Sequence, residues 1–145
     1  MNQDERIDSF LAGIRKLSKL IFKAKSQIVK DFSLKSIHTI ILFYLVKKGP
    51  LTSASLVRLT LEDKAAVSKA LSSLKKNGLV EFDRGYNSQV NLTKNGLKVA
   101  SIIYNEALDF EKEARKGISE EDANVFLNVL DKYINNIQEA IQEEE

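Results

Sequence analysis

Residues 52–93 read TSASLVRLTLEDKAAVSKALSSLKKNGLVEFDRGYNSQVNLT, and this stretch decides the fold. Thr52 is expected to begin a short helix, and Asp63 a second one, because short polar side chains accept hydrogen bonds from the free N–H groups of a first helical turn. Residues 60–62 form the turn between the two helices. Two short helices joined in this way predict a helix-turn-helix.

The second helix is expected to have one apolar and one polar face. A period of 3.6 residues turns Val67, Ala70, Leu71 and Leu74 toward a core. The residues on the opposite face are Lys64, Ala65, Ser68, Lys69 and Ser72. Asn77-Gly78 should end the helix, since glycine readily adopts the left-handed conformation of a C-cap.

Two strands are predicted directly after this helix, at residues 79–83 and 88–92 around a loop at 84–87. Val80 and Phe82 are in phase with Val90 and Leu92, so one face of the hairpin should be buried. A helix-turn-helix followed by a β-ribbon is the pattern of a winged helix-turn-helix. In that fold the second helix enters the DNA major groove and the ribbon flanks it.

Long helices are predicted on both sides of the motif. Residues 5–31 read as one helix with an apolar residue at every seventh position from Ile7 to Ile28. This seam requires a partner, either the C-terminal helix or a second chain, although packing on its own domain is equally compatible. An apolar helix at 37–46, ended by Gly49-Pro50, is expected to be central, with Ser33 or Ser36 as its cap. The residues predicted to mediate dimerisation are Ile7, Phe10, Ile14, Phe126, Leu130, Tyr133 and Ile137.

The expected architecture is a single domain, residues 1–145, that is mainly α-helical with a small β-hairpin. Residues 34–93 form the winged lobe, and residues 5–31 and 97–141 form a helical dimerisation frame. A capping sequence at 119–122 separates the last two helices.

The charge is unevenly distributed along the chain. Residues 1–98 contain 18 Lys and Arg against 8 Asp and Glu, whereas residues 99–145 contain 4 against 12. A basic first part suits a polyanion such as DNA. A solvated surface with a chance asymmetry is the alternative.

Composition disfavours several other functions. The chain has no Cys and one His, so a disulfide framework, a thiolate nucleophile or a zinc site is not expected. No glycine-rich phosphate loop and no Ser/His/Asp grouping is found, and neither an enzymatic role nor a cofactor is predicted. The first residues lack the pattern of a signal peptide and no apolar run could span a bilayer, so a cytoplasmic location is expected.

The polar face of the second helix has the side chains that a groove-reading helix needs. Small residues such as Ala65 and Ala66 let its backbone approach base edges, Lys64 and Lys69 can reach phosphate or guanine, and Arg84 can enter the minor groove. A solvated charge is the alternative for each. The residues predicted to contact DNA are Thr52, Ser53, Lys64, Ala65, Ala66, Ser68, Lys69, Ser72 and Arg84.

Several segments together resemble the MarR family of bacterial transcriptional regulators. They are SIHTI at 36–40, GPLT at 49–52, DKAAVSKAL at 63–71, LKKNGLV at 74–80 and LTKNG at 92–96. The resemblance implies a homodimer whose first and last helices interlock above two winged lobes. It also implies a repressor that binds a pseudo-palindromic operator and is released by a small ligand.

The chain departs from the family pattern in two places. Arg84 is the one basic residue at the tip of a short wing, and Ala65 and Ala66 stand where hydroxyl residues are common. Both departures keep open a winged-helix protein-interaction module that does not bind DNA. A small-molecule sensor is a third hypothesis. Its candidate pocket walls are residues of types that more often belong simply to the core: Leu17, His38, Tyr44 and Tyr104.

Overall fold

The computed structural model describes residues 1–24, 27–85 and 87–144. The chain forms two compact units, residues 1–106 and residues 107–145. The boundary between these units lies within a helix, α6 (Lys94–Ala114). Tyr86, in the predicted hairpin loop, lies outside the described residues.

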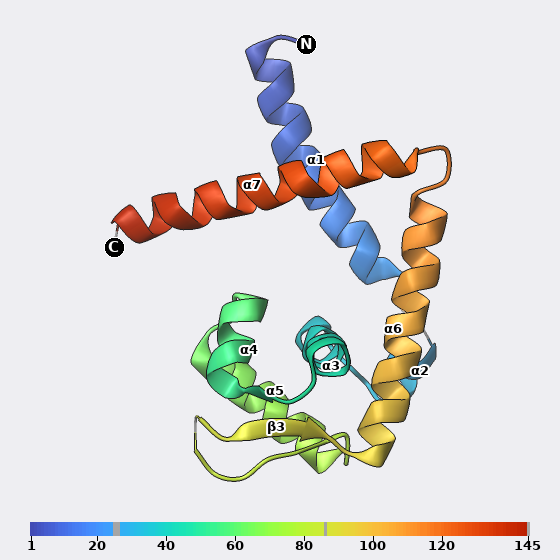
Figure 1. The fold of residues 1–145 in the computed structure, drawn as a ribbon, viewed down its shortest axis with the longest axis vertical. Helices are drawn as coiled ribbons and strands as arrows, with labels where there is room; N and C mark the ends of the chain where they lie inside the picture. The colour runs from blue at the N-terminus through green and yellow to red at the C-terminus, as the bar shows by residue number, and fades with distance from the viewer. Residues whose placement is uncertain (25–26, 86, 145) are drawn as a thin grey trace. The chain divides into compact units, whose positions relative to one another are not determined.

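The first unit contains the predicted winged helix-turn-helix. Its helices are α3 (Ser36–Lys48), α4 (Ser53–Thr60) and α5 (Lys64–Lys76), and its strands are β1 (Leu51–Thr52), β2 (Val80–Glu81) and β3 (Gln89–Leu92). The strands form an antiparallel sheet in the order β1-β3-β2, with Val80 opposite Leu92 and Leu51 opposite Val90. Figure 1 shows α4 and α5 beside α3, and β3 also packs against α3. The predicted hairpin and its register are confirmed.

The core of this unit lies between α3, α5 and the sheet. Ile41, Leu42, Leu56, Val67 and Leu74 are buried in it. Val67, Ala70, Leu71 and Leu74 are the buried residues of α5, as its 3.6-residue period predicts. Because one face of α5 is fixed in the core, the opposite face is presented to solvent.

The N-terminal region differs from the expected single helix over 5–31. It forms α1 (Gln3–Lys23) and a separate short helix α2 (Gln27–Asp31), while residues 25 and 26 lie outside the described part. Val29 is buried in the core of the winged lobe and Ile28 packs against it. Ile28 therefore packs against the core of the lobe. On a continuous helix it would have continued the apolar seam of Ile7, Ile14 and Ile21.

The start of α3 also differs from expectation. Neither Ser33 nor Ser36 caps it: the N-cap is Lys35, and the backbone N–H of Lys35 donates to Nδ1 of His38 at 2.9 Å. His38 is therefore a hydrogen-bonded histidine of the core.

The second unit consists of the end of α6 and α7 (Glu120–Glu144). The hydroxyl of Ser119 accepts from the N–H of Asp122 at 3.0 Å, as the capping sequence predicts. None of the residues of α7 is buried within the single chain. None of the helices in the described part combines the length and hydropathy needed to cross a bilayer.

Candidate nucleic-acid interface

The N-terminus of α5 is fixed by the residue that the sequence assigns to it. The Asp63 carboxylate accepts a hydrogen bond from the N–H of Ala66 at 2.7 Å. The preceding turn begins at Leu61, the C-cap of α4, whose φ of 57° lies in the left-handed region. This turn and cap set the direction in which α5 leaves α4, and so the direction of its polar face.

That polar face is exposed as predicted. Lys64, Ala65, Ser68, Lys69 and Ser72 are all exposed. Hydroxyl and ammonium groups on adjacent turns form a surface that can approach the edges of base pairs and their phosphates.

The wing is closed by a tight loop at its tip. The hydroxyl of Ser88 donates to the carbonyl oxygen of Arg84 at 2.9 Å, and its backbone N–H donates to the carbonyl of Gly85 at 3.2 Å. Gly85 has a φ of 114°, a backbone conformation that side chains with a Cβ rarely adopt. These contacts hold the backbone that carries the exposed Arg84.

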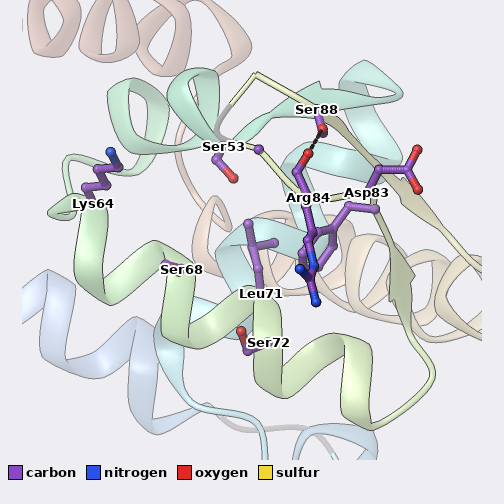
Figure 2. Close-up of a pocket in the computed structure, with 10 residues that line it drawn as sticks. Ser53, Lys64, Ser68, Leu71, Ser72, Asp83, Arg84 and Ser88 are labelled. Carbon is purple, nitrogen blue, oxygen red and sulfur yellow. Dashed lines mark hydrogen bonds between the residues drawn. The ribbon is translucent and has the colours of Figure 1, made fainter.

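A cavity of about 330 Å³ lies between the polar face of α5 and the wing. Figure 2 shows Lys64, Ser68 and Ser72 on the helix, with the Arg84 side chain extending toward the helix from the wing. The full lining is Ser53, Lys64, Ser68, Leu71, Ser72, Phe82, Asp83, Arg84, Gly85 and Ser88. Two cationic side chains and four serine hydroxyls thus share one concave surface, and this composition suits an anionic, hydrogen-bonding ligand.

The cavity unites some of the predicted DNA-contacting residues and leaves others outside. Five of them line it: Ser53, Lys64, Ser68, Ser72 and Arg84. Ala65 and Lys69 lie on the exposed face of α5 beyond the cavity, and Ala66 is half-buried. The hydroxyl of Thr52 caps α4 by accepting from the N–H of Ser55 at 3.1 Å.

Sequence reasoning did not single out Lys75 or Ser88. The ammonium of Lys75 donates to the carbonyl of Phe82 at 2.9 Å and lies 4.5 Å from the centre of the Phe82 ring. Ser88 could have been found from the glycine three residues before it, since a Gly-x-x-Ser loop suggests a closed turn. The Lys75 contact has no such local signal.

The four candidate pocket residues are only partly united. The ring of Phe43 stacks on Tyr104 at 5.6 Å between centroids and meets Tyr44 edge-on at 5.9 Å. Phe43 therefore joins two of the candidates, and Lys47 reaches the Tyr104 hydroxyl at 3.5 Å. Within the described part of the chain, neither His38, buried at the start of α3, nor Leu17, exposed on α1, makes a hydrogen bond or ring contact with this cluster. None of the four candidates, Leu17, His38, Tyr44 and Tyr104, lines the cavity described above.

Burial, and secondarily the positive charge of Lys35, lower the pKa of His38 below its ordinary value of 6.5. The neutral imidazole is therefore the form that the fold favours, and its Nδ1 can accept the hydrogen bond from Lys35. Among the described residues, no group of three or more His, Asp and Glu side chains could hold a metal ion.

Comparisons with known proteins found a family model and solved structures that resemble this chain. Residues 32–85 match the MarR family model. Over the whole of both chains, the structure resembles a MarR-family regulator from Neisseria meningitidis, with a TM-score of 0.80 at 19% identity. The comparison with curated proteins gave no match.

Two further similar structures contain DNA. A MarR-family regulator from Listeria monocytogenes in complex with a 26mer DNA gives a TM-score of 0.81 at 22% identity, with 90% of this chain and 89% of that chain covered. The MepR–DNA complex of S. aureus gives 0.75 at 20% identity, with 89% and 96% covered. Residues 32–85 thus match the MarR family model in sequence, and the chain shares its fold with these MarR-family structures.

Proposed function

We propose that this protein is a sequence-specific, DNA-binding transcriptional repressor that acts as a homodimer on a pseudo-palindromic operator. The observation that carries the proposal is the concave surface between α5 and the wing, where Lys64 and Arg84 flank serine hydroxyls. The cationic groups would neutralise phosphates, and the small residues of α5 would let the helix enter the major groove. Two structures of similar fold contain DNA, which supports the same role. Because duplex DNA is the proposed partner, we also propose a cytoplasmic location.

The unburied apolar stripes of α1 and α7 support a homodimer. Ile7 and Ile14 of α1 are 49% and 40% exposed, and Phe126 and Ile137 of α7 are 50% and 48% exposed. Apolar side chains spaced at three and four residues along long helices are typical of a helical interface. A second copy of the chain supplies a matching stripe, and the dimer would present two α5 helices to half-sites about 34–36 Å apart.

A small effector that releases the DNA is a further part of the proposal. The cluster of Phe43, Tyr44 and Tyr104 with Lys47 offers aromatic surface beside a cation and a phenol. Such a surface would suit a flat anionic molecule. Titration of the DNA complex with aromatic acids tests this part, and operator affinity that never changes would contradict it.

The function itself is tested by selecting bound duplexes from a random DNA library. A regulator of this kind should enrich a two-fold symmetric sequence. A protein-interaction module should retain no duplex, and that result would overturn the proposal. A non-symmetric enriched site would contradict the dimeric arrangement alone.

A further inference from the structure

Lys75 joins two elements of the proposed DNA-binding surface that the backbone connects only through a loop. It lies on the last turn of α5, one turn beyond the polar residues that line the cavity. Its ammonium bonds to the backbone carbonyl of Phe82, immediately before Asp83 and Arg84. The contact therefore links the end of the helix to the base of the wing.

The contact has two components that fix its geometry. The carbonyl of Phe82 accepts the ammonium at 2.9 Å, and the ring of the same residue lies 4.5 Å from that ammonium. A charged donor strengthens the hydrogen bond, and the ring face attracts the cation. Phe82 itself packs against the core, so Lys75 holds a residue that is already partly fixed.

The loop beyond Phe82 is closed by its own contacts. Ser88 binds the carbonyls of Arg84 and Gly85, so these described residues of the tip are held to one another. Motion of the tip relative to α5 must then occur at its base, near Phe82 and Asp83. Lys75 bonds at that point.

We propose that Lys75 is a positioning residue that sets the spacing between α5 and the wing, so that Arg84 and the polar face of α5 can engage one duplex together. The inference rests on the proposed DNA-binding function. It assigns Lys75 no contact with DNA. Its effect on binding should pass through Arg84.

The adjacent Lys76 is a matched control. It is exposed on the same turn and carries the same charge, and it makes no hydrogen bond or ion pair with any other residue that the structure describes. Replacement of either lysine by Met keeps an unbranched side chain and removes one positive charge.

The test is a thermodynamic cycle in the full-length protein with the selected duplex at fixed salt. Lys75→Met should weaken binding about fivefold, the effect of one lost hydrogen bond. In the Arg84→Ala variant, adding Lys75→Met should weaken duplex binding no more than adding Lys76→Met does. Lys75→Arg, which keeps a cationic donor, should restore most of the affinity. Equal effects of the two Met variants in both backgrounds would overturn the proposal.

A second readout does not depend on DNA. The amide of Ser88 bonds to Gly85 in the wing, so its hydrogen exchange reports the order of the tip. In Lys75→Met it should exchange about fivefold faster, whereas core amides such as that of Leu42 and all amides of Lys76→Met keep their rates. Unchanged exchange at Ser88 would contradict the positioning role. If Ser88 exchanges faster in Lys75→Met but the wild-type protein binds no duplex, Lys75 still positions the wing and the proposed DNA-binding function is overturned instead.

Discussion

Gly96 lies directly against the backbone of Leu79. A Cβ added at residue 96 would stand 2.7 Å from the Leu79 carbonyl carbon and closer still to its oxygen. The Thr93 hydroxyl connects the same segments, because it donates to the carbonyl of Gly78 and accepts from the N–H of Gly96 at 2.9 Å. The end of α5, the start of the wing and the start of α6 thus meet at one glycine.

Replacement of Gly96 by Ala should destabilise the protein by about 2–3 kcal/mol, because backbone atoms of Leu79 would have to move to admit the methyl group. Denaturant unfolding followed by circular dichroism measures the change. Gly13→Ala is the control, since a Cβ at residue 13 meets nothing within 4 Å and Ala favours a helix over Gly. Equal stability of the two variants would contradict the close approach at Gly96.

Replacement of Asp63 by Ala should cost about 1 kcal/mol of stability, because the N–H of Ala66 would lose its acceptor at the start of α5. Thermal unfolding measures the loss. Glu62→Ala removes the same charge one residue earlier, where the side chain makes no hydrogen bond with a described residue, and should leave stability nearly unchanged. A loss of similar size in both variants would point to charge rather than to the cap.

The free energy of unfolding should decrease as the pH is lowered, because His38 becomes protonated. Its pKa is lowered by burial and by Lys35, so the unfolded chain takes up the proton first as the pH falls. The stabilisation from neutral His38 is fully present above the ordinary value of 6.5 and is lost as the pH falls through the lowered value. His38→Gln removes this titration. The difference in unfolding free energy between wild type and variant should therefore shrink between about pH 7.5 and pH 5. A constant difference would contradict the lowered pKa.

Replacement of Ile137 by Glu should convert the proposed dimer into a monomer, because a charge would be placed in the apolar stripe of α7. Sedimentation equilibrium should give a mass near the 16.3 kDa of one chain for the variant and twice that mass for the wild type. Asn135→Glu places the same charge on the opposite side of α7 and should remain dimeric. A monomeric wild type would contradict the proposed assembly.

The winged lobe was predictable because its signals are local. The period of α5 gives its buried and exposed faces, Asp63 and Gly78 mark its ends, and the alternation of Val80, Phe82 and Val90 gives the register of the hairpin. These patterns need only sequence neighbours and a core on one side.

The remaining features depend on contacts between distant segments. The break after α1 follows from burial of Val29 in the lobe, which outweighs an unbroken heptad pattern. Lys35, and not a serine, is the N-cap of α3, and the ring of His38 in the first turn accepts a hydrogen bond from the N–H of Lys35. The bond from Lys75 to Phe82 joins a side chain to a backbone carbonyl across a turn, and residue type alone does not indicate it.

The most direct test of the central claim is the affinity of the protein for its selected duplex between about 50 and 200 mM salt. The account predicts that the logarithm of the affinity falls linearly with the logarithm of the salt concentration. Lys69→Ala and Arg84→Ala should each weaken binding and reduce the slope by about one per subunit. Lys98→Ala, at an exposed position on α6, should change both the affinity and the slope little. An affinity that does not depend on salt, or that both Lys69→Ala and Arg84→Ala leave unchanged, would contradict duplex binding by α5 and the wing.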